Sequence, residues 1–268
     1  PMAATKKPAA KPGNALTQRA QVNLPAHVQE AMNADIAAFQ QRMSAPVGNR
    51  ISVTQDKKFR NAAGEKYDTV RGVIVDFVAK KAFYEGEYDK DDVVPPNCFA
   101  IGFAPHDALE ASENSPELQH QDGCKTCPKN AFKSAPNGKG KACRDIYTLA
   151  LLPPDAEEGA PLVTLALSAT AIKPFEKYVR DLARDYGKAP YCFVTEFTFD
   201  DEMDYASVRC VNPEVADGNL IALAYSMRDD ATKMLEAEPD CSEFEEKVVA
   251  KRVASSKKAA GKSAAARR

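Results

Sequence analysis

The chain has 268 residues, of which 44% are apolar, enough for a buried core in one large or two modest domains. It has no uninterrupted apolar run of the ~18 residues that a membrane-spanning helix needs, and its first residues carry lysines without the apolar stretch of a secretory signal. We therefore expect a cytoplasmic protein whose seven cysteines are thiols or metal ligands rather than disulfide partners.

The net charge of −2 hides an uneven distribution of charge. Residues 1–20 contain four cations and no acid, residues 247–268 contain eight cations and no acid, and the chain between them is acidic. Composition predicts disorder for the basic arm 1–24 and for the acidic-then-basic tail 239–268. Basic arms of this kind either contact nucleic acid or act as solubilising tails, and both interpretations stay open.

Residues 25–238 are expected to form the folded domain. Apolar residues at three- and four-residue steps predict a helix that begins at Pro25 and ends before Pro46. From residue 50 to about 102 the period becomes two, which is typical of strands, and further extended segments are predicted after Cys143. Among these, residues 190–200 and 205–211 are expected to pair as a hairpin.

Two further helices are predicted. One follows Ser168 or Thr170 as its cap, carries Pro174 in its first turn and ends at Gly187. The other covers residues 214–236. Short strands with about three peripheral helices predict an α+β fold, mainly antiparallel, built as a small barrel or a strongly bent sheet.

Cysteines cluster in one short part of the chain. Cys124 and Cys127 form a C-x2-C pair, whose spacing turns two thiolates toward one point, and Cys143 follows after a glycine-rich return. With Cys98 they make four candidate ligands for a tetrahedral zinc ion, although His106 or His120 could take the place of Cys98.

A closed, structural zinc site suits this segment best. The segment between Cys124 and Cys143 has few apolar residues to offset its ordering entropy, whereas metal–thiolate bonds can fix it. A redox C-x-x-C would open a helix after a strand, and the H-x-E signature of zinc deaminases is missing. Cys192 and Cys210 fall in strand-like sequence and are expected to be core or edge residues.

Aromatic residues beside cations suggest a surface for single-stranded nucleic acid, which is held by basic grooves and stacking rings. The alternative is that these aromatics belong to the core and the lysines to strand edges. Phe132, between the cysteines, is expected to pack under its loop. The candidate nucleic-acid contacts are Lys57, Lys58, Phe59, Arg60, Lys80, Lys81, Phe83, Tyr84 and Tyr88, together with Lys129, Lys139 and Lys141.

The stretches "PPNC" and "CKTCPKNAFKSAPNGKGKACRD", followed by "SATAIKPFEKYVRDL" and "FVTEFTF", resemble a group of tailed-bacteriophage single-stranded DNA-binding proteins over roughly residues 50–235. The resemblance implies an OB-fold-like barrel with a zinc-held insertion at about 98–143, whose ligands are Cys98, Cys124, Cys127 and Cys143. It also implies a role in phage DNA replication or recombination, within the cytoplasm of the host cell. Many such binders end in an acidic tail that recruits replication or recombination proteins, but this chain ends in a basic one.

These observations favour a non-enzymatic binder of single-stranded DNA over two alternatives. One is a zinc-stabilised structural or transcription-associated interaction protein of a phage, which would explain the acidic body without a binding groove. The other is an enzyme, but the sequence has no P-loop, no dinucleotide fingerprint and no G-x-S-x-G motif. The acids at 200–204 could bind Mg²⁺ in a nuclease, yet they read as a hairpin tip.

Overall fold

A computed structural model describes residues 25, 50–86, 94–119 and 123–241. All of the elements below belong to one compact unit that begins at Gly48. The helix predicted between Pro25 and Pro46, both terminal arms apart from residues 239–241, and Tyr88 lie outside the described residues. No helix in the described part of the chain is both long enough and apolar enough to cross a membrane.

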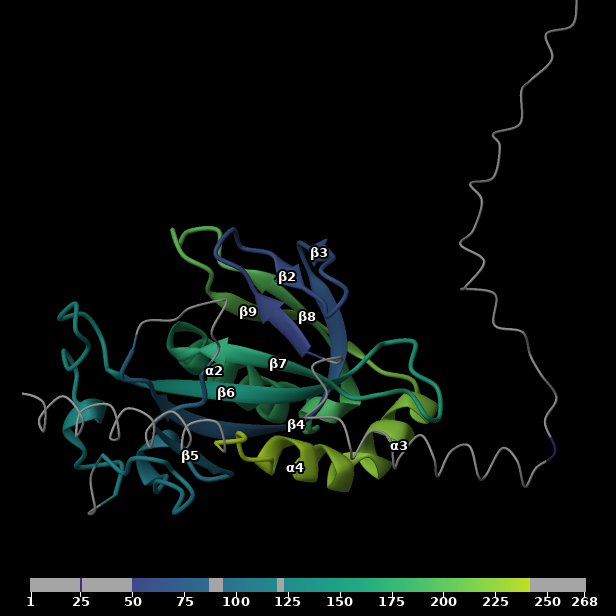
Figure 1. Cartoon of the computed structure of the whole chain (residues 1–268). Coiled ribbons are helices and arrows are strands. Elements are labelled where there is room, and N and C mark those ends of the chain that lie inside the picture. The colour runs from purple at the N-terminus through teal and green to yellow at the C-terminus, as the bar shows by residue number, and fades with distance from the viewer. Residues whose placement is uncertain (1–24, 26–49, 87–93, 120–122, 242–268) are drawn as a thin grey trace, which may run out of the picture. The chain divides into compact units, whose positions relative to one another are not determined.

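One strongly curled sheet of nine strands organises the described residues (Figure 1). Its order is β3-β2-β1-β7-β6-β4-β8-β9, with β5 paired to β4, and every pairing is antiparallel except that of β1 with β7. The prediction of an α+β fold with a mainly antiparallel, bent sheet is therefore confirmed. The strands are β1 (Arg50–Val53), β2 (Phe59–Arg60), β3 (Lys66–Tyr67), β4 (Val70–Phe83), β5 (Cys98–Gly102), β6 (Cys143–Leu152), β7 (Val163–Ser168), β8 (Phe193–Phe199) and β9 (Val208–Val215).

Strand β4 is the longest and pairs with three others. One edge runs along β6, while the other edge is shared by β8 near its start and β5 near its end. The register with β6 shifts between Ile74 and Asp76, and such a bulge bends a strand and increases its twist. Gly72 suits the crowded start of β4, because a Cβ atom there would lie 2.9 Å from the carbonyl oxygen of Leu152.

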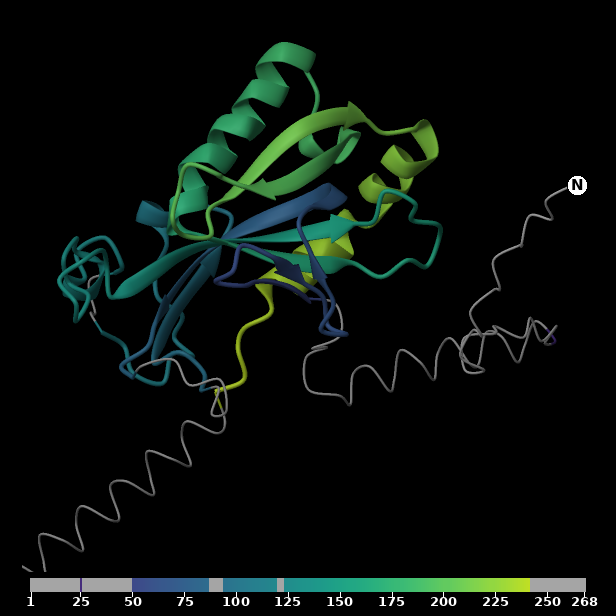
Figure 2. The ribbon, with the colours of Figure 1, turned by 90° about the horizontal axis from the view of Figure 1, so that it is seen from above.

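The inner face of the sheet is apolar and carries most of the aromatic core. Helix α2 (Ala169–Tyr186) covers part of it, with Phe175 packed edge-on against Phe77. Phe59 of β2 stacks on Phe199 of β8 with ring centroids 4.5 Å apart, so the sheet curls far enough for its distant strands to meet (Figure 2). This contact joins segments 140 residues apart in the sequence into one core.

The outer face has a smaller core under two short helices. Val73, Val75 and Val78 of β4 pack with Leu220 of α3 (Gly218–Ser226) and Leu235 of α4 (Arg228–Glu236). The single helix predicted over 214–236 is therefore wrong in its extent, because β9 runs to Val215 and the helix is broken at Met227.

The cause of this difference is local hydrogen bonding. Asp217 caps α3 by accepting hydrogen bonds from the backbone N–H groups of Asn219 and Leu220, which fixes the helix start. Met227 then leaves the helical conformation, with φ of −88° and ψ of 3°, while Ser226 donates its hydroxyl to the carbonyl of Leu223 in the last turn of α3.

The predicted end of α2 is confirmed, whereas the predicted position of Pro174 is not. Gly187 ends the helix in a left-handed conformation with φ of 61°, as predicted. Ser168 takes the N-cap position, but its side chain makes no capping hydrogen bond, and Pro174 lies inside the helix rather than in the first turn. The position of Pro174 was therefore predicted wrongly.

Candidate metal centre

The sheet brings Cys98 and Cys143 to one place. Phe83, the last residue of β4, pairs with Cys98 on one side and with Cys143 on the other. Directly paired residues point to the same face of a sheet, so both thiols share the face of Phe83. The three side chains form a small buried cluster of their own.

Cys124 and Cys127 come to this cluster from the intervening loop. A turn joins them, with the N–H of Cys127 donating to the carbonyl of Cys124 at 3.4 Å, and the short helix η3 (Pro128–Asn130) follows at once. The side chain of Asn130 donates to the carbonyl of Cys124 at 2.9 Å and holds the turn from the other side. The C-x2-C pair is therefore fixed in orientation by its own segment.

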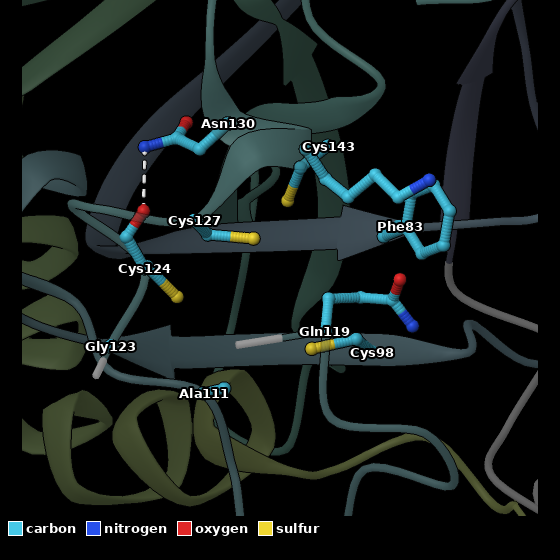
Figure 3. Close-up of a pocket in the computed structure, with 10 residues that line it drawn as sticks. Phe83, Cys98, Ala111, Gln119, Gly123, Cys124, Cys127, Asn130 and Cys143 are labelled. Atoms are coloured by element: carbon cyan, nitrogen blue, oxygen red, sulfur yellow. Dashed lines mark hydrogen bonds between the residues drawn. The ribbon is translucent and has the colours of Figure 1, made fainter. Parts of the chain in front are cut away.

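All four cysteines line one small cavity, which we call the cysteine cavity (Figure 3). Its volume is about 20 Å³, and a space of that size holds a single water molecule or ion. All four thiols are free, and only Cys127 is more than slightly exposed to solvent. The sequence-based grouping of Cys98, Cys124, Cys127 and Cys143 thus corresponds to one location in the fold.

The cavity fits zinc in the chemistry of its side chains, although they are not arranged as a finished site. Four thiolates are the ligand set of structural tetrahedral zinc. In the described part of the chain, no group of three or more Cys, His, Asp and Glu side chains is arranged so that it could hold a metal ion as it stands. Binding of an ion would therefore require the thiols to rearrange around the cavity.

The two histidine alternatives to Cys98 fare differently. The Nε2 atom of His106 lies 2.9 Å from the carbonyl oxygen of Ile146, and its ring packs on Tyr147. His106 does not line the cysteine cavity, whereas Cys98 does. His120 lies outside the described residues, although Gln119 beside it lines the cavity.

A buried lysine lies next to the thiols. Lys81 is only 1% exposed, and its ammonium donates to Asn130 Oδ1 at 2.9 Å and to Asp145 Oδ1 at 2.5 Å. Burial raises the pKa of Cys143 to about 12, and the charge of Lys81 opposes that rise. The same two effects act on Cys124, whose pKa is also raised. Lys81 is thus placed to compensate the negative charge that thiolates would carry on metal.

Three of the residues predicted to contact nucleic acid are buried, so those predictions are wrong. Phe59 and Phe83 are 0% and 6% exposed, and Lys81 is engaged with Asp145. Phe83 and Lys81 lie on the inner face of β4, and Phe59 belongs to the same aromatic core. An aromatic ring or cation without access to solvent cannot meet a base or a phosphate.

Several of the predicted lysines already have partners. Lys58 forms an ion pair with Asp68, and Lys141 forms one with Asp145 at 2.7 Å. Lys57 donates to the carbonyl of Asp200, and Lys129 lies over the ring of Phe83. Lys139 is exposed.

Two of the predicted cations, Arg60 and Lys80, lie on the outer face of the sheet together with Arg50 and Arg144. We call these four residues the basic row. Cross-strand pairs and alternation along the strands place them on one face, through Ser52 opposite Arg60 and Thr164 opposite Arg50. Thr164 in turn lies opposite Ala150 of β6. Ile146 lies on the same face of β6 as Ala150 and opposite Lys80 of β4, so Lys80 shares this face.

The cations of the basic row make no ion pair with the part of the chain that the structure describes, and only Lys80 among them is half-buried. Arg50, Arg60 and Arg144 are exposed. The guanidinium of Arg144 lies 5.8 Å from the ring centroid of Tyr84. Burial and the neighbouring Arg50 lower the pKa of Lys80 to about 8.

Sequence reasoning did not single out Arg50 and Arg144 as candidate contacts. Their signal was the alternation itself, since Arg144 follows a cysteine of the inner face and so points outward. Phe132 was also misplaced, because it is 74% exposed rather than packed under its loop. Of the acids considered for a nuclease, Asp200 binds Arg209 with one carboxylate oxygen and the N–H of Glu202 with the other.

Comparisons with models of known protein families, with curated protein sequences and with solved structures give no match to this chain.

Proposed function

We propose that this protein is a non-enzymatic, largely sequence-independent binder of single-stranded DNA that serves phage DNA replication or recombination. In this proposal the curled sheet acts as an OB-like barrel and receives the strand on its outer face. Zinc held by Cys98, Cys124, Cys127 and Cys143 fixes the loop at one end of that sheet. Replication or recombination proteins would meet the tail beyond residue 238.

The observation that carries the proposal is the basic row. Its four cations lie on one face of the sheet and form no ion pair with another described residue, in a chain whose net charge is −2. A row of positive charge on one face suits a polyanion as its partner. Tyr84, beside Arg144, offers a ring on which a base can stack.

A single strand suits this surface better than a duplex. A general duplex binder is usually basic overall, whereas a single-strand binder needs cations only along its groove. Little base preference is expected, because stacking tolerates every base.

The test is a titration of labelled oligo-dT at several salt concentrations. Wild-type affinity should fall with salt, with a log–log slope of about −0.7 for each phosphate neutralised. Arg50→Ala and Arg144→Ala should each weaken binding and lower the slope magnitude by about 0.7. Arg184→Ala removes the same charge from an exposed site on α2 and is the matched control.

Two results would overturn the proposal. One is the lack of any shift at micromolar protein, which would favour a zinc-stabilised structural or transcription-associated interaction protein. The other is binding that Arg50→Ala and Arg144→Ala weaken no more than Arg184→Ala does. Incubation with DNA and Mg²⁺ or Mn²⁺ checks the non-enzymatic part, since cleavage products would contradict it.

A further inference from the structure

The loop between Cys127 and Cys143 displays an aromatic side chain to solvent. Phe132 is 74% exposed, the highest value among the exposed large apolar side chains of the described residues. It is the only aromatic residue in the sequence between Cys124 and Cys143. A ring in this position contributes nothing to the core of the loop that carries it.

The turn that carries Phe132 is held on both sides. The N–H of Ser134 donates to the carbonyl of Ala131 at 3.2 Å, which places Phe132 and Lys133 at the tip of the turn. Ser134 also donates its hydroxyl to the carbonyl of Lys129 and accepts a hydrogen bond from the N–H of Ala142. The ring is therefore presented by a turn tied to both arms of the loop.

The backbone at the tip has an unusual conformation. Lys133 has φ of 71°, a left-handed value that residues other than glycine rarely adopt. Strained backbone of this kind often accompanies binding sites, where the surrounding structure holds it. In this turn it directs Phe132 and Lys133 to solvent together.

The charge around Phe132 is of one sign. Residues 123–144 contain six cations and no acid. Lys125, Lys133 and Lys139 are exposed, and none of them forms an ion pair with a described residue. A ring among unpaired cations complements a ligand that has both a flat aromatic face and negative charge, which is the chemistry of a nucleotide.

We infer that Phe132 is a second contact for the single strand, with a nucleobase stacked on its ring and phosphates beside Lys125, Lys133 and Lys139. The inference rests on the proposed function and adds to it a contact outside the basic row. Loss of one base–aromatic stack should weaken binding about 5- to 100-fold. The exposed loop would thus take part in recognition as well as carrying two of the cysteines.

The chain has no tryptophan, so a single substitution creates a specific reporter. Phe132→Trp should keep the stack and show quenched fluorescence when oligo-dT is added, over the same concentrations at which the anisotropy of labelled oligo-dT rises. Tyr186→Trp, a 50% exposed position at the far end of α2, is the matched control and should show no quenching. Phe132→Leu keeps an apolar side chain without a ring, and should bind 5- to 100-fold more weakly than the wild type while unfolding at the same urea concentration.

Each outcome separates this inference from the function on which it rests. If oligo-dT binds Phe132→Trp without any change in its fluorescence, or binds Phe132→Leu as tightly as the wild type, the inference is overturned and the proposed function stands. If wild-type protein binds no oligo-dT, both are overturned. Quenching at position 132 together with weaker binding by Phe132→Leu would support the inference, and would exclude Phe132 as a contact reserved for a protein partner.

Discussion

Lys81 and Asp145 face each other directly across the ladder between β4 and β6, and their side chains form an ion pair on the inner face of the sheet. Lys81 is 1% and Asp145 13% exposed, while Lys141 binds the second carboxylate oxygen. Burial acts to raise the pKa of Asp145, but hydrogen bonds from Lys141 and Lys81 outweigh it and leave that pKa lowered. The pair joins the sheet to the loop, because Lys81 also binds Asn130.

Lys81→Met should destabilise the protein by about 3 kcal/mol, the low end of the cost of breaking a buried pair, because Lys141 still neutralises Asp145. Urea unfolding at constant zinc measures the loss. Lys81→Met combined with Asp145→Leu should recover part of it, since no buried charge is then left alone. Because the pKa of Asp145 is lowered in the fold, its stabilising contribution should disappear as the pH falls through that lowered value. A Lys81→Met protein as stable as the wild type would contradict this account.

Cys124→Ser should reduce bound zinc from one ion per chain to well below one, because a hydroxyl is a poor substitute for a thiolate ligand. Mass spectrometry of native protein measures the ratio. Cys192→Ser, a free cysteine that does not line the cysteine cavity, is the control and should keep its zinc.

Removal of zinc by a chelator should release the loop while leaving the sheet folded. Trypsin should then cut first at the loop lysines 125–141, because little apolar burial holds this segment. Purified protein without zinc, or trypsin sensitivity that chelation does not change, would show that no metal fixes the loop.

Under the proposed function, Lys80 should make DNA affinity depend on pH near neutrality. Its pKa of about 8 lies below the ordinary value of 10.5, so its charge is lost as the pH rises through 8. Oligo-dT binding should therefore weaken between pH 7 and 9, and the salt slope should fall by about 0.7. Lys80→Arg keeps its charge throughout and should remove this dependence.

The lowered pKa of Lys80 has the opposite effect on folding: DNA affinity should fall as the pH rises, whereas the stability of the fold should increase. Between pH 8 and 10.5 the unfolded chain holds a proton on Lys80 that the folded chain has lost, so stability should rise with pH in that window.

The prediction for DNA affinity has its own contradicting outcome. An equal pH dependence of DNA binding in wild type and Lys80→Arg would show that Lys80 is not a contact.

Phe59→Ala should cost about 3–5 kcal/mol of stability, because Phe59 is fully buried and stacked on Phe199. Its affinity for oligo-dT, measured below the unfolding temperature, should stay close to that of the wild type. The reverse pattern, weaker binding without destabilisation, would instead mark Phe59 as a stacking platform for bases.

Local signals in the sequence were enough for the strands, the end of α2 and the grouping of the cysteines. The segments 190–200 and 205–211, which were predicted to form a hairpin, pair as the antiparallel strands β8 and β9. Gly187 at the end of α2 could be predicted because a left-handed residue there favours glycine. These features depend on near neighbours, so a short window contains their cause.

The identity of the exposed cations and rings could not be read in the same way. Phe59 and Lys81 stand beside cations, which suggested a surface, but Phe199 and Asp145 lie far along the chain and bury them. Phe132 stands between cysteines, which suggested packing, but no distant segment covers it among the described residues. Burial at these positions is set by strand pairing over long separations, which local patterns do not contain.

The position of Phe83 between Cys98 and Cys143 has a consequence for the evolution of the segment between them. Strands β5 and β6 hold the two ends of this segment on either side of Phe83. Strand pairing therefore offsets the entropy lost when the segment closes into a loop. The closure cost grows only slowly with length, so insertions and deletions at the turn formed by residues 135–138 should be tolerated. Selection could thus reshape this part of the chain as an exchangeable module without disturbing the sheet from which it emerges.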